Sequence, residues 1–218
     1  MPLRIHLFFI EMFKFLNSAK TKPMKKYSLS LSLPEWVHDF LEKYEFPLVS
    51  HEERMRFVLD LTLQNIERAT GGPFGAAVFE RKSGQLVSVG VNVVMKQSCS
   101  VAHAEMMAIM LAQQELGTHD LGISELPELQ LVTSGKMCAM CLGSVVWSGI
   151  REVVASAQPE DVENIVGFDE GPAPTDYDQQ LEKRGISIIP SFLREEGCAV
   201  LQRYVDLGGV VYNPSRSA

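Results

Sequence analysis

Hydrophobic and polar residues follow a regular pattern along the chain from about position 34 onward. After Ser50, apolar residues from Met55 to Ile66 recur at the three- and four-residue spacing of an amphipathic helix. Ser50 and Glu53 stand at the start of this run with the spacing of a capping box. The pattern therefore predicts a helix that begins at Ser50 and is ended by the run Gly71-Gly72-Pro73.

Further along the chain, segments with strand spacing alternate with segments of helical spacing. A short helix is expected to open at Pro34-Glu35-Trp36, with Ser32 as its N-cap. The expected strands are Ala76–Glu80, Leu86–Val94, Leu129–Thr133, Glu152–Ala157 and Ile186–Pro190. The other expected helices are Ala102–Leu116, Cys138–Trp147, Glu160–Ile165, Tyr177–Lys183 and Leu193–Val205. This alternation predicts an α/β protein, a three-layer α/β/α domain around a mixed sheet of about five strands.

Charge is distributed unevenly between the first 33 residues and the rest of the chain. Residues 1–33 carry six Lys or Arg and one acidic residue, a net charge of +5, whereas residues 34–218 carry 14 against 26, a net charge of −12. The apolar run Leu7–Leu16 is interrupted by Glu11 and Lys14, is shorter than a membrane-spanning helix, and is followed by no clear signal-peptide cleavage site. We expect residues 1–33 to be a basic, disordered extension, with translation starting at Met24, and residues 34–218 to form one folded domain.

Composition narrows the class of protein further. The chain of 218 residues is 46% hydrophobic and 22% charged, which is typical of a folded globular protein. Its net charge of −7 disfavours a dedicated nucleic-acid-binding protein, because phosphate contacts need clustered Lys and Arg. Four cysteines are too few for a disulfide framework of this length, and the pair Cys138 and Cys141 favours metal or redox chemistry. We expect neither a nucleic-acid partner nor a membrane partner.

Two short motifs lie where helices are expected to begin: His103-Ala104-Glu105 and Cys138-Ala139-Met140-Cys141. Cys138 and Cys141 share one helical face, and the positive end of the helix dipole favours their thiolate form. Because zinc binds thiolates together with imidazole nitrogen, His103, Cys138 and Cys141 are predicted to hold one Zn²⁺ per chain. Residues two apart face different ways inside a helix, so we expect His103 just before its helix and Glu105 beside the metal.

The number of ligands distinguishes the kind of zinc site. Three protein ligands leave a position open for water, which is the arrangement of catalytic sites. Zinc lowers the pKa of that water towards ~7, and Glu105 is expected to accept its proton and pass it on. One alternative is a closed structural site with Cys99 or Cys198 as fourth ligand; both are otherwise expected to be buried thiols. A redox-active cysteine pair is a further alternative, although it would leave the His-x-Glu triplet unexplained.

These residues resemble the signature of the zinc-dependent cytidine deaminase-like superfamily, in which H-x-E is followed by P-C-x-x-C. The resemblance extends from about Ser50 to Asn213. Other segments resemble the guanine deaminase branch, in particular the bacterial type that also accepts triazines such as ammeline. These segments are Gly71–Val78, Gly90–Asn92, Leu142–Trp147 and Gly167–Glu170. The resemblance implies that residues 34–218 form a zinc-dependent deaminase domain with the cytidine deaminase-like fold.

The resemblance also implies roles for residues other than the zinc ligands. Asn92 would hydrogen-bond the heterocycle, and Phe74 would stack on it or form a wall of its pocket. Glu170 would be a second acid that helps to carry a proton to the leaving amino group. Tyr212 and Asn213 would close over a pocket, which in domain-swapped relatives is that of a partner subunit. The alternatives are that Phe74 is plain core and that Glu170 belongs to a solvated loop.

One position departs from the pattern of the family. Met137 stands where the family has proline directly before the first cysteine, and Lys136 stands where relatives usually carry Glu. Because proline presets the start of a helix, its absence is expected to loosen the loop more than it harms ligation. Substrate preference and metal affinity are therefore left open, while the predicted catalytic set is complete.

The residues and the resemblance together predict hydrolytic deamination of a free aminated purine base. The expected reaction converts guanine to xanthine and ammonia by attack of zinc-bound hydroxide, with Glu105 as the proton shuttle. Alternatives with the same chemistry are ammeline and other s-triazines, guanosine, or another nucleoside. A non-catalytic zinc-binding scaffold is the alternative of a different class, and it would not need Glu105 beside an open coordination position. We expect a cytoplasmic homodimer that binds a small heterocyclic base.

Overall fold

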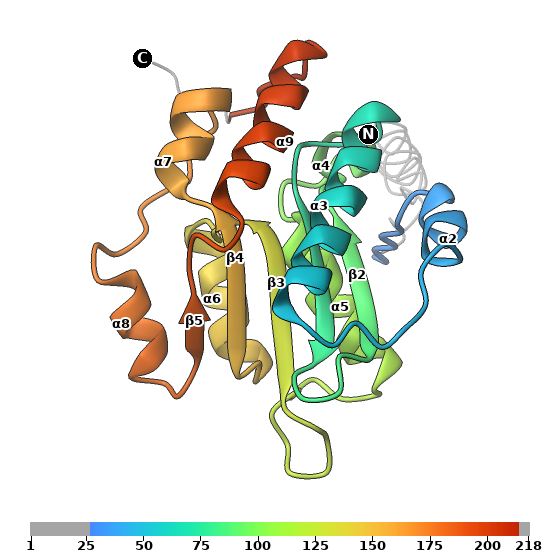
Figure 1. Cartoon of the computed structure of the whole chain (residues 1–218), viewed down its shortest axis with the longest axis vertical. Helices are drawn as coiled ribbons and strands as arrows, with labels where there is room; N and C mark the ends of the chain where they lie inside the picture. The colour runs from blue at the N-terminus through green and yellow to red at the C-terminus, as the bar shows by residue number, and fades with distance from the viewer. Residues whose placement is uncertain (1–26, 214–218) are drawn as a thin grey trace, which may run out of the picture. The chain divides into compact units, whose positions relative to one another are not determined.

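The computed structural model describes residues 27–213, and Figure 1 draws the others as a grey trace. Residues 31–213 belong to one compact unit, which holds all the helices and strands given below. Within it, Leu31 and Leu33 pack against the apolar core. The start expected at Met24, and most of the extension expected over residues 1–33, lie outside the described residues.

Five strands form one mixed sheet in the order β2-β1-β3-β4-β5. They are β1 (Gly75–Glu80), β2 (Leu86–Val91), β3 (Leu129–Gly135), β4 (Glu152–Ala157) and β5 (Ser187–Ile189). β1 pairs antiparallel with β2 and with β3, whereas the pairs β3–β4 and β4–β5 are parallel. The predicted mixed sheet is therefore confirmed.

Helices cover both faces of this sheet, as Figure 1 shows. They are α2 (Trp36–Leu41), α3 (His51–Glu67), α4 (Val94–Gln97), α5 (Ala104–Glu115), α6 (Ala139–Ser148), α7 (Pro159–Asp161), the π-helical turn η1 (Val162–Val166), α8 (Tyr177–Glu182) and α9 (Arg194–Asp206). α3 and α9 lie on one face, and α5 and α6 lie on the other, so the three-layer prediction is confirmed. Within residues 27–213, no helix combines the length and the apolar character that crossing a membrane requires.

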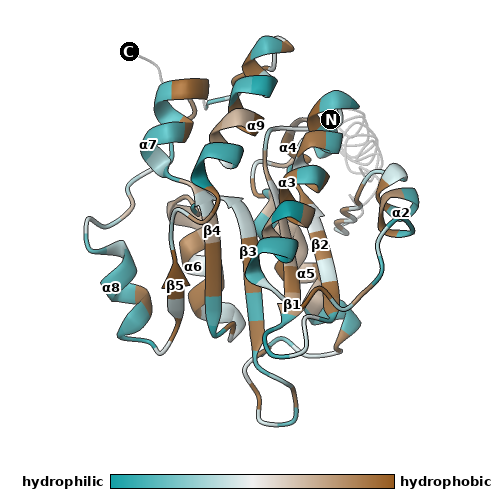
Figure 2. Cartoon of the chain, in the orientation of Figure 1, coloured by the Kyte–Doolittle hydropathy of each residue, from teal (hydrophilic) through white to brown (hydrophobic). Residues whose placement is uncertain are grey.

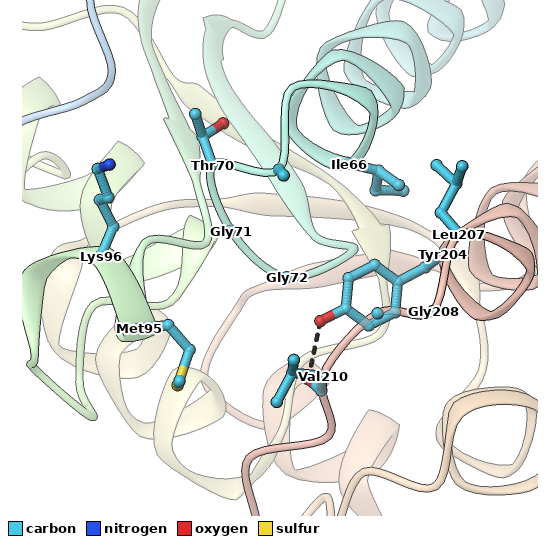
Figure 3. Close-up of a pocket in the computed structure, with 12 residues that line it drawn as sticks. Ile66, Thr70, Gly71, Gly72, Met95, Lys96, Tyr204, Leu207, Gly208 and Val210 are labelled. Atoms are coloured by element: carbon cyan, nitrogen blue, oxygen red, sulfur yellow. Dashed lines mark hydrogen bonds between the residues drawn. The ribbon is translucent and has the colours of Figure 1, made fainter.

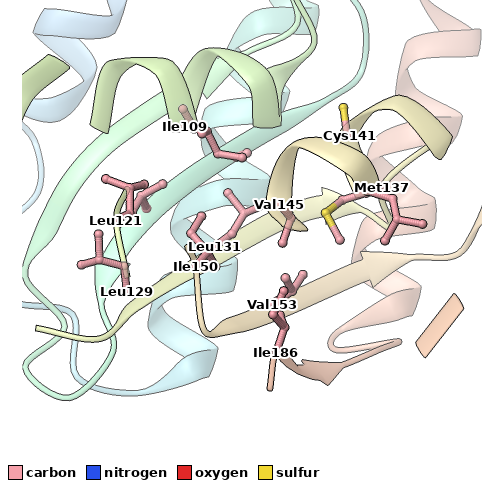
Figure 4. Close-up of a cluster of buried hydrophobic side chains, with 14 of the residues drawn as sticks. Ile109, Leu121, Leu129, Leu131, Met137, Cys141, Val145, Ile150, Val153 and Ile186 are labelled. Carbon is pink, nitrogen blue, oxygen red and sulfur yellow. The ribbon is translucent and has the colours of Figure 1, made fainter. Parts of the chain in front are cut away.

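The side chains of the central strands alternate between two apolar clusters, one on each face of the sheet. In β1, Ala76 and Val78 pack with residues of α5 and α6, while Ala77 and Phe79 pack with residues of α2 and α3. This follows from the two-residue period of a strand. Figure 2 accordingly shows β4 and β5 largely in hydrophobic colours and α8 largely in hydrophilic ones. The cluster under α5 and α6 also buries Cys141, so the core itself fixes one predicted zinc ligand (Figure 4).

The start of α3 agrees with the prediction, whereas its end does not. Ser50 Oγ accepts the Glu53 N–H at 3.1 Å, and Glu53 Oε2 accepts the Ser50 N–H at 2.8 Å, which completes the capping box. The helix ends at Glu67, before the predicted Gly71-Gly72-Pro73 run. The reason is local: Ala69 adopts a φ of 52°, the left-handed conformation that ends helices.

Two further boundaries differ from the prediction. β2 ends before Asn92 rather than at Val94, because the Asn92 Oδ1 accepts the Val94 N–H at 3.3 Å and turns the chain into α4. Ser32 does not cap α2, since Glu35 occupies the N-cap position and no side chain caps that helix. The carbonyl oxygen of Ser32 instead accepts a hydrogen bond from Gln97 Nε2 at 3.1 Å.

Arg54 in α3 is the largest side chain that the described part of the fold buries completely, with 1% of its surface exposed. Its guanidinium donates hydrogen bonds of 2.8 to 3.1 Å to the carbonyl oxygens of Leu48, Val49 and Arg81 and to Gln130 Oε1. These acceptors lie before α3, after β1 and within β3. One buried cation therefore connects three separate parts of the chain on one side of the sheet.

The helix expected over Glu160–Ile165 is a short α-helix, α7, followed by the π-helical turn η1. Asp161, the last residue of α7, accepts hydrogen bonds from the Arg194 Nε at 2.7 Å and Nη2 at 2.8 Å. It also accepts the backbone N–H of Gln158 at 2.8 Å. These contacts, led by Arg194, lower the pKa of Asp161 from 3.8 to about 2.

Replacing Arg194 with Met is expected to lower the free energy of unfolding near pH 5, and to lower it by a smaller amount near pH 3. The pKa of Asp161 is lower in the folded protein than in the unfolded chain. Its contribution is therefore complete above about pH 4–5 and is lost as the pH falls through about 2. Urea unfolding of both proteins across this range measures the difference. A difference that stays constant on acidification would contradict this explanation.

Candidate active site

Two loops place the predicted zinc ligands at the starts of α5 and α6. His103 is the N-cap residue of α5 and Cys138 that of α6, and both have an extended backbone. Cys141 lies one turn further, on the buried side of α6. The prediction that both motifs stand at helix starts is therefore confirmed.

The three predicted ligand atoms lie close together. His103 Nδ1 is 3.6 Å from Cys138 Sγ and 3.7 Å from Cys141 Sγ, and all three lie within 4.8 Å of one another. Tetrahedral zinc bonds of ~2.0–2.3 Å place ligand atoms at comparable separations, so the donor set fits Zn²⁺. Neither Cys99 nor Cys198 belongs to this cluster, and the expectation that both are buried is wrong, since both are only half-buried. Among the described residues, a closed four-ligand site is therefore not formed.

The two cysteines of the motif influence each other's ionisation. The pKa of Cys138 is lowered to about 4, first because the Cys141 thiol hydrogen-bonds its sulfur and also because His103 is adjacent, although burial opposes the shift. The same interaction and burial raise the pKa of Cys141. Cys138 is thus a thiolate at neutral pH, which is the form that metal ligation needs.

Glu105 lies beside the ligand cluster, in the first turn of α5. Its side chain is buried, and its Oε2 is 3.5 Å from Cys141 Sγ. Burial, reinforced by the charge of Cys138, raises the pKa of Glu105. A carboxyl group whose pKa is shifted towards neutrality can both accept and return a proton. The position agrees with the expected place of Glu105 beside the metal.

A cavity of about 630 Å³ opens onto these residues. The predicted site residues that line it are Phe74, His103, Glu105, Cys138, Glu170 and Tyr212. Ser100, Met140 and Phe168 line it as well, although no motif had singled them out as functional. The volume is within the range of small-molecule sites, roughly 300–1,000 Å³.

Aromatic side chains form one wall of the cavity. The ring of Phe168 lies 5.7 Å from that of Phe74 and 4.7 Å from that of Tyr212, measured between centroids. Phe74 is half-buried and lines the cavity, so it is not plain core. Flat apolar faces of this kind suit a planar heterocycle.

Asn92 is almost completely buried directly after β2, with 1% of its surface exposed. Its backbone N–H donates to Phe74 O and its carbonyl accepts from Asn65 Nδ2, both at 3.0 Å. The Nδ2 atom faces the Tyr212 hydroxyl and has no other hydrogen-bond partner among the described residues. A Cβ at Gly72 would lie 3.2 Å from Asn92 Oδ1 and 2.7 Å from Tyr212 Oη, so glycine there allows both side chains to approach.

Glu170 lies in the cavity wall rather than in a solvated loop. Its carbonyl oxygen accepts the Ala139 N–H at 3.1 Å, which joins its loop to the start of α6. Burial, together with the charges of Cys138 and Glu105, raises the pKa of Glu170 to about 8. Asn213 holds the same loop, since its Nδ2 donates to the Gly167 carbonyl oxygen at 2.9 Å.

The segment after α9 brings Tyr212 back to the cavity of its own chain. Figure 3 shows its anchor: Tyr204 Oη donates to the carbonyl oxygen of Val210 at 2.8 Å. Gly208 turns the chain with a φ of 72°, and Gly209 lies so close to the Tyr204 ring that a Cβ would come within 2.3 Å of it. A smaller cavity of about 360 Å³ lies between this segment and the loop after α3. Tyr212 and Asn213 therefore line the cavity of the chain to which they belong.

Comparisons with known proteins agree with this site. Residues 49–157 match the model of the cytidine and deoxycytidylate deaminase zinc-binding region. The chain is 31% identical over 147 residues to the guanine deaminase of Bacillus subtilis (strain 168), which covers 67% of this chain and 89% of that protein. A solved structure of guanine deaminase from Nitrosomonas europaea is 46% identical, with a TM-score of 0.78 over 82% of this chain and 97% of that one. A solved complex with 2,6-diaminopurine is 47% identical, with a TM-score of 0.79 over 85% and 97%.

The matched region extends from the residue before Ser50 to the end of β4. It therefore contains His103, Glu105, Cys138 and Cys141 together with most of the sheet that positions them. The donor set, the fold and the sequence likenesses agree, and the chain belongs to the zinc-dependent cytidine and deoxycytidylate deaminase family, in its guanine deaminase branch.

Proposed function

We propose that this protein hydrolyses guanine to xanthine and ammonia in a zinc-dependent reaction. The observation that carries the proposal is the convergence of His103, Cys138 and Cys141 beside the buried carboxyl group of Glu105, facing a cavity of about 630 Å³. The relatives support it, since two are guanine deaminases and a further solved structure holds an aminated purine.

The ligand residues and Glu105 divide the chemistry between them. Zn²⁺ held by His103, Cys138 and Cys141 would act as a Lewis acid and activate water for attack on the amino-bearing carbon. Glu105 accepts a proton from that water and delivers it to the ring. It then takes the second proton from the hydroxyl group now attached to the carbon and passes it to the amino group, so that the C=O bond forms as the carbon–nitrogen bond breaks. Guanine and water give xanthine and ammonia, so the reaction needs no other reactant.

The remaining site residues hold the ring and assist the leaving group. Asn92 Nδ2 donates a hydrogen bond to an acceptor atom of the base, in place of its contact with the Tyr212 hydroxyl. Phe74 packs against the face of the ring, and Tyr212 covers the cavity beside Asn92. Glu170, which is half-buried in the cavity wall, is a second carrier of the proton that leaves with ammonia.

An ammonia-release assay with zinc-loaded protein tests the proposal. Guanine, guanosine, ammeline, cytosine and adenine are supplied separately, and xanthine is measured in parallel for guanine. The highest kcat/KM is expected for guanine. Turnover of another ring in place of guanine would refute guanine as the substrate but not the proposed reaction. If metal-replete protein turned over none of these rings, both the substrate and the reaction would be refuted.

Replacing Asn92 with Asp is expected to lower kcat/KM for guanine by about tenfold or more, mainly through KM. Aspartate keeps the oxygen that accepts the Val94 N–H, but it replaces the Nδ2 donor group of Asn92 with a second acceptor. Steady-state kinetics measure the change, and an unaltered melting temperature shows that the turn into α4 is kept. An unchanged KM would contradict the assigned hydrogen bond.

We also propose that the protein works in the cytoplasm as a homodimer. Free thiols at all four cysteines support a reducing compartment. The resemblance to domain-swapped relatives supports the dimer, and α6 presents Trp147, which is 87% exposed and apolar, as a residue for such a contact. Light scattering on the zinc-loaded protein measures the mass, and a monomer mass at micromolar concentration would reject the dimer. Cell fractionation tests the location.

A further inference from the structure

The loop before the first cysteine ligand lacks the proline of the family signature. That signature places proline directly before the first cysteine, where its fixed φ restrains the start of the helix. Here the position is Met137, which has no such restraint. Cys138 nevertheless has to keep its sulfur near His103 Nδ1, at 3.6 Å. Other contacts must therefore hold this loop.

Two of these contacts involve the backbone and the Met137 side chain. The Lys136 N–H donates to the carbonyl oxygen of Ala157 at 2.7 Å, at the end of the β3–β4 pairing. Met137 is fully buried in the cluster under α5 and α6, near Val145 (Figure 4). These contacts fix the side of the loop that faces the core.

The third contact holds the side of the loop that faces the cavity. Lys136 Nζ lies 2.7 Å from Asp178 Oδ1 and 4.5 Å from the centroid of the Tyr177 ring. Tyr177 and Asp178 are the first two residues of α8, a helix that is distant from the zinc ligands in sequence. Only 11% of the Lys136 side chain is exposed, although a lysine normally keeps its ammonium group in water. An ion pair together with a cation–π contact explains why it is held in place.

We propose that Lys136 is a positioning residue for Cys138, and that its contacts with Asp178 and Tyr177 replace the restraint that proline supplies in the family. The loop is thereby fastened to α8, and the thiolate is presented to zinc in a fixed place. The inference rests on the zinc site of the proposed function and is independent of the substrate. Its consequence is slower release of the metal.

Zinc release from the loaded full-length protein tests this role. The chromophoric chelator 4-(2-pyridylazo)resorcinol, in excess, reports the rate. Lys136→Met, which keeps the length and apolar stem of the side chain, is expected to release zinc about tenfold faster. Lys183→Met is the matched control. Lys183 follows the last turn of α8, its side chain is 62% exposed, and its Nζ lies at the longer distance of 3.8 Å from Asp176 Oδ2. A wild-type rate for Lys136→Met would overturn the inference.

Two further variants separate positioning from general destabilisation. Asp178→Asn is also expected to accelerate zinc release. Because Asp178→Asn and Lys136→Met remove the same contact, the double variant is expected to release zinc no faster than the more affected of the two single variants. Rate effects that multiply independently would overturn the inference.

The outcomes also separate this inference from the proposed function. A wild-type protein that binds no zinc would refute the zinc site itself. A wild-type protein that binds zinc without deaminating guanine would refute the substrate and leave the release experiment valid. Unchanged release from Lys136→Met refutes only the role of Lys136.

Discussion

Replacing Glu105 with Gln is expected to lower kcat for guanine by about 100- to 10,000-fold while the protein keeps one zinc ion per chain. Glutamine preserves the shape of the side chain and one acceptor oxygen, but it cannot carry a proton. Glu105 lies outside the ligand cluster of His103, Cys138 and Cys141, so its replacement leaves the donor set complete. Steady-state kinetics with guanine, combined with metal analysis of the same preparation, measure both quantities.

The control for this variant lies on the same helix. Glu115 is the exposed last residue of α5, and Glu115→Gln is expected to leave both kcat and zinc content unchanged. If Glu105→Gln kept wild-type activity, the assignment of Glu105 as proton carrier would be wrong. Loss of zinc from Glu105→Gln would instead show that the carboxyl group takes part in holding the metal.

Replacing Arg54 with Met is expected to lower the free energy of unfolding by about 3–5 kcal/mol. The substitution removes the donors for Gln130 Oε1 and three carbonyl oxygens in a place that water does not reach. Each buried acceptor without a donor costs roughly 1–3 kcal/mol, although partial rearrangement of the loop before α3 reduces the sum. Urea unfolding of the zinc-loaded protein measures the change.

Arg56 supplies a matched control for the loss of an arginine from α3. It is 56% exposed and pairs with Glu52 at 3.1 Å, so Arg56→Met is expected to cost less than about 1 kcal/mol. The cost of Arg54→Lys is expected to lie between the costs of these two variants, because a single ammonium group cannot reproduce the forked set of guanidinium donors. A cost for Arg54→Met no larger than that for Arg56→Met would show that the buried network does not stabilise the fold.

The sheet and its helices were predictable because burial imposes a period on the sequence. Alternate residues of β1 meet opposite clusters, and the capping box of Ser50 and Glu53 marks one helix start through purely local contacts. Boundaries set by one side chain were not predictable. Asn92 ends β2 with its own side-chain hydrogen bond to the Val94 N–H. Ala69 ends α3 with a left-handed φ, a conformation that alanine rarely adopts and that its residue type therefore does not predict.

The metal ligands were predictable for a similar reason, since short spacings at helix starts fix their geometry locally. Other parts of the site depend on the tertiary path of the chain. Asn213 holds a loop whose contacted residues lie 44 and 46 positions earlier, and no motif marks such a pairing. Phe168 reaches the cavity wall in the same way. Cys198, expected in the core, is only half-buried and lies beside Asp161.

The placement of the zinc ligands on two different helices affects more than catalysis. His103 and Cys138 are 35 residues apart, and β3 lies between them, so bound zinc closes a loop that contains α5 and the central strand. Global unfolding has to open that loop and release the ion, because an extended chain cannot gather the three donors at 3.6 to 3.7 Å. By mass action, each tenfold rise in free zinc above its dissociation constant adds about 1.4 kcal/mol to the stability of the folded chain. The supply of the metal thus sets the stability of the folded enzyme as well as its activity.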